Sequence, residues 1–483
     1  MKISKKAIIF VTMISFIITM FLPSLTVTQA AETDGKGKTY VIATDTTFAP
    51  FEFQDTNGEF IGIDMDLLKT IAEEQGFKVE IKQLGFNAAV QALESKQVDG
   101  VIAGMSITDE RKKKFDFSDP YFESGVVMAS KEGQEEIKSY EDLKGKNVAV
   151  KTGTEGASFA ESIKDKYGFT ITTFDDSANM YDDVKTGNSA ATFDDYPVLA
   201  YGVAQGNGLE LVTEKEKGGS YGFAVSKGKN QELLEMFNAG LADLKESGKY
   251  DEIIDSYLSA EKSAEDTGFI GLLKESYPSL LKGLGMTLFL TVVSLAIALV
   301  LGVVFGLFRV SKAKWMRAIG TIYVDIFRGT PLIVQAFFIY FGIPAALDFR
   351  MTAIVAGLIT LSLNAGAYMA EIVRGGIESV DKGQMEAARS LGLPYGKAMR
   401  KVVLPQAVRI MIPSFINQFI ITLKDTSILS IIGINELTQS GKIIIARNLE
   451  SFKMWLIVGI MYFIIIMILT QVSKRMERKI QNG

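Results

Sequence analysis

The chain has 483 residues, 48% of them hydrophobic, and contains no cysteine and no histidine. These absences exclude disulfides, a thiol nucleophile, Ser-His-Asp catalysis and the usual zinc ligands, so we expect no cofactor and no metal site. Residues 268–483 hold 23 Lys and Arg against 11 Asp and Glu, a net charge of +12, whereas the preceding residues hold 28 against 45, a net charge of −17. This division predicts an acidic soluble half followed by a basic membrane half, and it argues against a nucleic-acid partner.

Residues 1–31 are predicted to be a secretory signal peptide. Three lysines, the last at Lys6, precede an apolar run that ends at Leu22, and Thr28-Gln29-Ala30 is a suitable cleavage site. A retained membrane anchor is the alternative. In both cases the residues that follow are exported.

Residues 40–258 alternate short apolar strands with amphipathic helices. Strands are expected at 40–44, 79–83, 101–105, 148–151 and 170–174, and helices at 64–75, 87–95, 156–164 and 178–186. The alternation predicts α/β architecture with parallel sheets covered on both faces. Two sheets of this size predict two lobes with a ligand cleft between them, lobe 1 at about 40–125 and 221–258 and lobe 2 at about 126–220.

Four segments of this region carry a specific pattern: ATDTTFAPFEF at 43–53, GIDMDL at 62–67, AGMSITDERKKKFDFSDPY at 103–121 and FDDYP at 193–197. They resemble the polar amino-acid family of extracellular substrate-binding proteins, most of all its glutamine-binding members. The resemblance implies a two-lobed periplasmic-binding-protein-like (type II) domain that captures a free amino acid.

The same resemblance implies a site made by both lobes. Arg111 stands at the family's carboxylate-binding arginine, a role that suits the two parallel donors of a guanidinium, and Asp195 stands at the aspartate that takes the ammonium group. The other implied residues are Gly104 and Ser106 beside the carboxylate, Phe48 and Phe86 as aromatic walls, Asp45 and Lys151 near the ligand side chain, Thr154 in the 152–156 turn, and Asp194, where a related protein has His. Without the motifs, these residues would be interpreted as a solvated charge run, core aromatics and turn residues.

Two glycine-containing connections, 124–127 and 218–222, are predicted to form the hinge, because glycine absorbs the φ and ψ changes of closure. Ligand contacts from both lobes would favour the closed state, so closure is our hypothesis for how occupancy is signalled. Residues 259–284 are expected to be a charged linker and an amphipathic helix with a break at Pro278.

Residues 285–476 are predicted to be an all-α transmembrane domain. Five apolar segments are long enough to cross a bilayer, at about 285–308, 331–347, 352–373, 407–423 and 454–472. The cluster from Arg309 to Arg317 places the end of the first segment in the cytoplasm, which leaves the binding domain outside and the C-terminus inside. Four cations oppose this topology because they fall on its outer side: Lys424, Lys442, Arg447 and Lys453.

Several polar groups lie at possible membrane depth. Asn364, Asn417 and Gln418 either line a pathway or form hydrogen bonds between helices. Two acid–base pairs have the spacing of partners on one helix face: Asp325 with Arg328, and Glu371 with Arg374.

A polar, basic stretch, EAARSLGLPYGKAMRKVVLP at 386–405, interrupts the apolar segments. Asp381 and Gln384 are expected to form a capping box, and a second helix is expected from Tyr395 to Pro405. The stretch resembles the EAA loop of ABC importer permeases at Glu386, Ala387, Ala388, Gly392, Leu404 and Pro405. In that family the loop docks on the cytoplasmic ATPase; a basic loop that only orients the protein is the alternative.

Segments 323–335, 364–377 and 423–429 resemble the histidine/glutamine-type permease family. Together the resemblances imply a substrate-binding domain fused to a five-helix type I ABC importer permease domain, transporting polar amino acids, with glutamine or glutamate expected. The implied partners are a cytoplasmic ATPase subunit, the lipid bilayer and a second copy of the permease domain. The chain itself is not expected to be an enzyme, because it lacks the phosphate-binding G-x-x-x-x-G-K-[ST] motif.

A ligand-gated channel and an amino-acid sensor are the alternatives. The predicted spans follow the two-lobed domain and do not interrupt it, and no TVGYG-like filter occurs. No signalling domain follows the last span. These features favour the importer.

Overall fold

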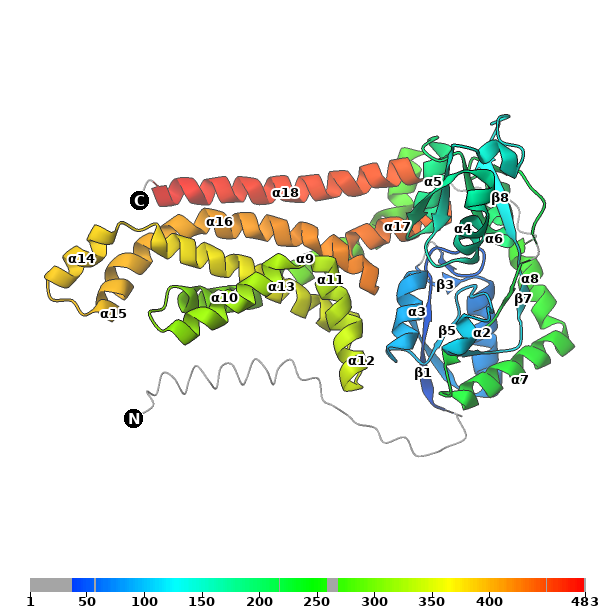
Figure 1. Cartoon of the computed structure of the whole chain (residues 1–483), viewed down its shortest axis with the longest axis horizontal. Coiled ribbons are helices and arrows are strands. Elements are labelled where there is room, and N and C mark those ends of the chain that lie inside the picture. The colour runs from blue at the N-terminus through cyan, green and yellow to red at the C-terminus, as the bar shows by residue number, and fades with distance from the viewer. Residues whose placement is uncertain (1–36, 56–57, 217, 259–267, 449, 482–483) are drawn as a thin grey trace.

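The computed structural model describes residues 37–55, 58–216, 218–258, 268–448 and 450–481. The predicted signal peptide and the linker 259–267 lie outside these residues. Figure 1 shows two α/β lobes at one end of the long axis and a set of long helices that extend from them to the other end. The predicted fold class is confirmed.

Lobe 1 is a five-stranded sheet with the strand order β4-β1-β5-β14-β6. Its strands are β1 (Thr39–Thr44), β4 (Lys78–Gln83), β5 (Gly100–Val101), β6 (Phe115–Phe117) and β14 (Ala224–Ser226). Its helices are α2 (Ile63–Gln75), α3 (Phe86–Glu94), α7 (Gln231–Ser247) and α8 (Lys249–Leu258). The predicted apolar face of α2, at Met65, Leu68 and Ile71, is buried against the core. A short hairpin of β2 (Phe53–Gln54) and β3 (Phe60–Ile61) lies at the entry to α2.

Lobe 2 repeats this plan with the strand order β10-β9-β11-β8-β12. Its strands are β8 (Val126–Lys131), β9 (Asn147–Lys151), β10 (Thr170–Phe174), β11 (Ala191–Asp195) and β12 (Leu209–Leu211). Its helices are α4 (Glu155–Tyr167), α5 (Ser177–Lys185) and α6 (Tyr196–Ala204).

The prediction of purely parallel sheets is wrong at β8 and β14. Each is the strand by which the chain enters a lobe from the hinge, so no helical crossover precedes it, and each pairs antiparallel with its neighbours. Both sheets are therefore mixed. The parallel pairs are those that the alternation predicted, such as β1 with β4 and β9 with β10.

The two predicted hinge connections lie against each other. β7 (Phe122–Glu123) pairs antiparallel with β13 (Ser220–Tyr221), and the Ser124 N–H donates to the Gly219 carbonyl at 3.0 Å. A Cβ at Gly218 would lie 2.7 Å from the Gly125 nitrogen, so this close approach requires glycine.

Among the described residues of the membrane half, four single helices or segments are long and apolar enough to cross a bilayer: α9 (Phe269–Arg309), α13 (Ala353–Glu378), Tyr395–Ile432 and α18 (Ser451–Gln481). A fifth candidate is a bent pair, in which α10 (Lys314–Gly329) meets Leu332–Leu347 at 105°. The latter segment contains α11 (Leu332–Phe337) and α12 (Ile343–Leu347). α17 (Leu437–Asn448) is a shorter helix beside the lobes (Figure 1).

Two proline predictions are wrong. α9 runs without a break through Pro278, and α16 (Leu404–Asp425) begins where the sequence predicted a stop at Pro405. Pro405 lies in the first turn of α16. Backbone N–H groups in that turn have no acceptor within the helix, so the N–H that proline lacks costs no hydrogen bond. A π-helical turn, Met399–Val403, joins α16 to the short helix α15 (Tyr395–Ala398), so the chain stays helical.

Polar side chains join the membrane helices. Asn364 of α13 donates to Gln335 of α11 at 3.1 Å and to the Phe327 carbonyl of α10, which favours the interhelical-bond interpretation of this residue. Glu371 pairs with Arg374 as predicted, but Arg328 pairs with Glu371 and not with Asp325. Arg309 of α9 adds a third cation to Glu371. This carboxylate therefore holds three helices together.

Gly302 of α9 lies directly on α13. A Cβ there would meet the Met369 Cβ and lie 3.2 Å from the Ala370 nitrogen, whereas a Cβ at Gly459 of α18 would meet no described atom within 4 Å. We expect Gly302→Ala to lower the free energy of unfolding by about 1–3 kcal/mol through overpacking. Gly459→Ala is the control and is expected to be neutral or mildly stabilising, because alanine favours helix. Thermal unfolding of the full chain in detergent measures both, and an unchanged Gly302→Ala protein would contradict the packing.

Candidate functional site

A small cavity lies between the two lobes. Its lobe 1 wall is Phe48, Phe86, Ala103, Gly104, Ser106 and Arg111, and its lobe 2 wall is Lys151, Thr154, Glu155 and Asp195. Eight of the ten residues predicted for the site are in this lining. The other two, Asp45 and Asp194, lie behind it and contact residues of the lining. The structure thus brings the predicted set together, while the role of each residue toward a ligand stays a prediction.

Arg111 crosses the cavity from lobe 1 to lobe 2. It begins a short 3-10 helix (Arg111–Lys113), and its guanidinium stacks 5.2 Å from the centre of the Phe86 ring. Nη1 donates to the Ser106 carbonyl and Nη2 to the Gly153 carbonyl of lobe 2, both at 2.8 Å. A guanidinium has five N–H donors, so three remain for a carboxylate.

Asp195 presents an unsatisfied acceptor to the cavity. Its Oδ2 accepts a 2.5 Å hydrogen bond from the Tyr221 hydroxyl of the hinge, while its buried Oδ1 has no donor among the described residues. Burial, followed by the negative charge of Asp194, raises the pKa of Asp195 to about 8. A cationic donor in the cavity would satisfy Oδ1 and favour the ionised carboxylate.

Asp45 and Lys151 form a buried ion pair between the lobes. Lys151 Nζ lies 2.5 Å from Asp45 Oδ2, and both side chains are only 2% exposed. Burial opposes the charge on Lys151, but Asp45 outweighs it and raises the pKa of Lys151 above its usual value. The Lys151 ammonium also lies 5.0 Å from the centre of the Phe48 ring, so it faces the aromatic wall of the cavity.

Asp194 supports this group from behind. Its Oδ2 accepts from the Tyr181 hydroxyl at 2.7 Å and its Oδ1 from the Asp195 N–H at 2.9 Å. Burial raises the pKa of Asp194, and the positive charge of Lys151 opposes that rise.

Gly104 and Thr154 use their polar groups within the protein. The Gly104 N–H donates to Asp64 at 2.8 Å, so it is not available to a ligand carboxylate. Thr154 is the N-cap of α4: its hydroxyl accepts from the Ala157 N–H and donates to the Lys151 carbonyl at 2.7 Å. Thr154 therefore positions the start of α4 at the cavity.

Sequence reasoning missed Ala103 and Glu155. Glu155 is the first residue of α4; its Oε1 accepts from the Gly219 N–H of the hinge, and its buried Oε2 finds no partner in the described part of the chain. The signal available was its position one residue after Thr154, because acidic residues are favoured in the first turn of a helix.

The lobes rest on the membrane half through α17, which contacts both of them. Toward lobe 1, Gln439 donates to the Thr46 hydroxyl at 3.4 Å, and Arg447 donates to the Asp55 carbonyl at 3.0 Å. Toward lobe 2, Lys442 lies 3.7 Å from Asp176 at the start of α5. α17 packs in turn on α9 and α18.

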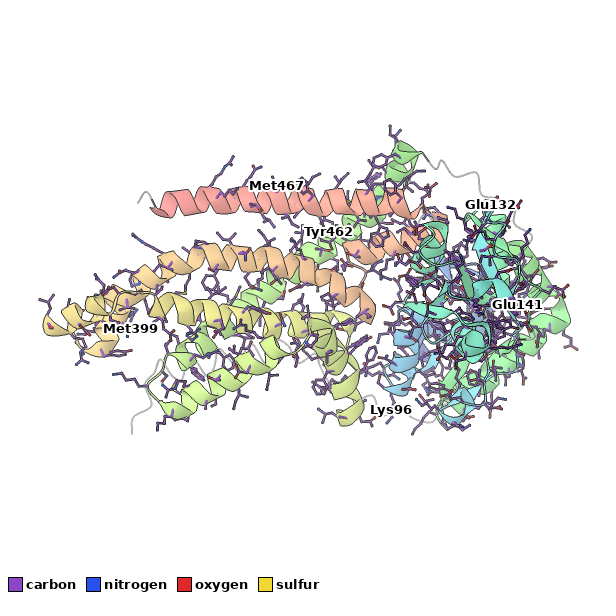
Figure 2. All side chains as sticks on the ribbon, turned by 45° about the horizontal axis from the view of Figure 1, so that its top comes forward. Lys96, Glu132, Glu141, Met399, Tyr462 and Met467 are labelled. Atoms are coloured by element: carbon purple, nitrogen blue, oxygen red, sulfur yellow. The ribbon has the colours of Figure 1, made fainter. Side chains whose placement is uncertain are left out.

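A second contact holds lobe 1 alone. Arg350, between α12 and α13, makes two hydrogen bonds to Asp99, at 2.6 and 3.2 Å, and a third to the Lys96 carbonyl. Lys96 pairs with Asp348 next to it. Figure 2 shows Lys96 on the part of lobe 1 beside α12, and Met399 at the opposite end of the molecule.

The EAA-like stretch lies at that opposite end (Figure 1). α14 (Lys382–Ser390) buries Ala388 and leaves Glu386 and Ala387 exposed, and Leu391 after it is 84% exposed. Gly392 turns the chain with a φ of +86°. The predicted capping box is incomplete: Asp381 caps the Gly383 N–H, while the Gln384 side chain contacts Gln406.

A cavity between two α/β lobes, docked on helices with four to five candidate spans, defines a solute-binding domain fused to a multi-pass membrane transporter. Residues 40–260 match bacterial extracellular solute-binding proteins, family 3, and residues 276–482 match the binding-protein-dependent transport system inner membrane component. The chain belongs to both families and joins two non-catalytic components of an ABC importer.

Two permeases are similar to this chain. It is 38% identical over 206 residues to the arginine transport system permease protein ArtQ of Bacillus subtilis (strain 168), covering 43% of this chain and 94% of that protein. It is 40% identical over 205 residues to the glutamine transport system permease protein GlnP of Escherichia coli (strain K12), covering 42% and 94%.

Two solved structures are similar in sequence to the binding half. One is substrate-binding domain 2 of Lactococcus lactis GlnP in an open conformation, which is 44% identical. The match covers 48% of this chain and 98% of that chain, with a TM-score of 0.37. The other is an ancestral arginine-binding protein bound to glutamine, at 43% identity, 45% and 97% coverage and a TM-score of 0.43.

Removing Asp45 from the Asp45–Lys151 pair is expected to lower the free energy of unfolding more than removing Lys151. Lys151→Met leaves an Asp45 that still accepts from the Thr46 and Thr47 N–H groups, whereas Asp45→Asn leaves a buried ammonium without its counter-ion. We expect Asp45→Asn to cost about 3–5 kcal/mol and Lys151→Met less. Asp348→Asn, in the exposed pair with Lys96, is the control and is expected to cost about 0–1 kcal/mol. Unfolding of the ligand-free full chain checks this, and equal losses from the two buried substitutions would contradict it.

Proposed function

We propose that this chain captures a polar amino acid, glutamine or glutamate, outside the cell and passes it inward, driven by a separate ATPase. The observation that carries the proposal is the pair of complementary groups facing one cavity from two lobes: the Arg111 guanidinium with three free N–H donors and the Asp195 carboxyl group with an unsatisfied oxygen. An α-amino acid has complementary groups, a carboxylate and an ammonium, on one carbon. A related permease named for glutamine transport supports the choice of ligand.

The remaining walls would receive the ligand side chain. Phe48 and Phe86 offer apolar faces, and the Lys151 ammonium offers a donor to a side-chain oxygen. A side-chain amide or carboxylate at this position would replace part of the Lys151–Asp45 interaction.

Arginine is the second candidate ligand, and the local charge favours it. Four carboxyl groups lie in the cavity wall (Glu155 and Asp195) or directly behind it (Asp45 and Asp194), against the two cations Arg111 and Lys151. A cationic side chain would offset part of this excess. Similar proteins are named for arginine as well.

The EAA-like stretch would be the surface on which the ATPase acts. Its exposed apolar residue, Leu391, lies beside Glu386 and Ala387, at the end of the long helices away from the lobes. That placement supports a topology with the lobes outside and this stretch in the cytoplasm. Two copies of the membrane domain would form the path, and two ATPase subunits would bind the two stretches.

Closure of the lobes would be signalled through α17. This helix touches Thr46 of lobe 1 and, through Lys442, Asp176 of lobe 2, so both contacts can exist together only for a limited range of lobe orientations. A ligand held by both lobes favours that range. Because α17 packs on α9 and α18, a change in lobe orientation would reach the spanning helices.

Ligand capture is tested with the purified full chain and a panel of common amino acids, by thermal shift and calorimetry. We expect glutamine, glutamate or arginine to raise the melting temperature, and Arg111→Glu to abolish the shift because it places a negative charge against the ligand carboxylate. Lys113→Glu is the matched control: it makes the same charge change two residues away, at an exposed side chain. If no amino acid shifts the wild type, or if Arg111→Glu binds normally, the proposal fails.

The α17 contact is tested by cysteine cross-linking, which is clean because the chain has no native cysteine. We expect Asp176→Cys with Lys442→Cys to be joined by a short bifunctional thiol reagent, and to be joined faster when the ligand is bound, since closure holds lobe 2 on α17. Lys166→Cys, on the exposed end of α4, with Lys442→Cys is the control pair. Mass spectrometry measures the yield, and a rate that does not respond to the ligand would contradict the signalling role of α17.

A further inference from the structure

The lobe 1 wall of the cavity is supported from behind by two buried carboxyl groups. Glu52 and Asp64 are each 0% exposed, and they lie within hydrogen-bonding reach of each other. Both oxygens of Glu52, and Oδ1 of Asp64, have no donor among the residues that the structure describes. Two carboxylates cannot donate to each other, so they form a hydrogen bond only if one of them carries a proton.

The surroundings decide which carboxyl group is the anion. Asp64 Oδ2 accepts two hydrogen bonds, from the Gly104 N–H and the Tyr121 hydroxyl, both at 2.8 Å. Asp64 also lies in the first turn of α2, where the helix dipole favours a negative charge. Glu52 has neither advantage. The proton therefore belongs to Glu52.

We propose that Glu52 is a positioning residue of the ligand cavity: its protonated carboxyl group donates a hydrogen bond to Asp64, which in turn holds Gly104 in the cavity wall. The inference rests on the proposed function, because it assigns a role in amino-acid binding. Burial, followed by the charges of Asp64 and Asp45, raises the pKa of Glu52 well above its usual value, which agrees with a protonated group at neutral pH. Burial also raises the pKa of Asp64, to about 6, against the two hydrogen bonds that it accepts.

Glu52 is linked to two residues of the lobe 1 wall, Phe48 and Gly104. Its backbone exchanges hydrogen bonds with Phe48, at 3.0 and 3.1 Å, and its side chain acts on Gly104 through Asp64. Gly104 has a φ of +51°, and a Cβ there would overlap Cε1 of the Phe48 ring. Gly104 and the Phe48 ring are in contact, so a shift of Gly104 would also displace the aromatic ring.

The charges that face Glu52 come from four elements. Asp64 belongs to α2, Asp45 follows β1, Lys151 belongs to β9, and the Tyr121 hydroxyl bonds to Asp64 from the residue before β7. Ionised Glu52 would meet two carboxylates and only one cation, which already pairs with Asp45. Ionisation would therefore push Asp64 away and loosen Gly104.

The pH dependence has a definite sign. A carboxyl group whose pKa is raised by folding contributes stability that is complete below its unfolded pKa, and that contribution is lost as the pH rises through the folded pKa. Glu52→Gln keeps a donor for Asp64 and removes the titration. The melting temperature of Glu52→Gln should therefore fall less than that of the wild type between about pH 5 and about pH 8. Glu59→Gln, at an exposed carboxyl group of the same hairpin, should follow the wild type.

The experiment uses the full chain in detergent and whichever amino acid the wild type binds. At neutral pH we expect Glu52→Gln to bind within about twofold of wild type and Glu52→Met, which has no donor, to bind about tenfold or more weakly. Rescue by Gln but not by Met supports positioning. Loss of affinity in Glu52→Gln beyond about fivefold, normal affinity in Glu52→Met, or a wild-type pH slope in Glu52→Gln would each overturn it.

Different outcomes contradict amino-acid capture and the role of Glu52. If the wild type binds no amino acid, the proposed function fails, while the ligand-free comparison of melting temperatures still decides whether Glu52 is protonated. If Glu52→Met does not fold, the comparison of Glu52→Gln with wild type decides alone.

Discussion

Buried charge between the lobes is the constraint on which the rest of the structure depends. Asp45 from lobe 1 and Lys151 from lobe 2 are both out of contact with water and neutralise each other. The same interface leaves Asp195 Oδ1 and Glu155 Oε2 without donors within the described residues. Closure of an empty cavity is therefore stabilised by one pair and opposed by the desolvation of two acceptors. A cationic group of a bound ligand would remove the opposing desolvation cost, so this arrangement of charges would make closure depend on the ligand.

The contacts of the membrane half would pass such a closure on to the spanning helices. α17 contacts both lobes and packs on α9, a helix of 41 residues that at 1.5 Å per residue extends about 60 Å. α9 and α13 share closely packed glycine contacts, and Glu371 ties α9, α10 and α13 together near the other end. Rigid helices joined by such contacts carry a displacement as a unit.

Local patterns in the sequence predicted what depends on local geometry. The alternation of strands and helices predicted the two lobes. The site residues came from the resemblance of four segments to a known family, and eight of the ten expected residues surround one cavity. The antiparallel direction of β8 depends on a hinge that brings distant segments together. The Glu52–Asp64 pair likewise needs a hairpin to bring two carboxyl groups into contact, and proline position alone could not show that Pro405 opens a helix. These features depend on tertiary contacts and not on the residue and its neighbours.

The basic membrane half and the acidic lobes form ion pairs where they meet. Cations at 442 and 447 opposed the predicted topology, because basic residues are usually retained inside. Lys442 instead pairs with Asp176 of lobe 2, and Arg447 pairs with Glu275 at 2.6 Å while it also binds the Asp55 carbonyl of lobe 1. Arg350 meets Asp99 in the same way. Cations that pair with the acidic lobes are neutralised where they lie, so their presence beside those lobes no longer argues against an outer location.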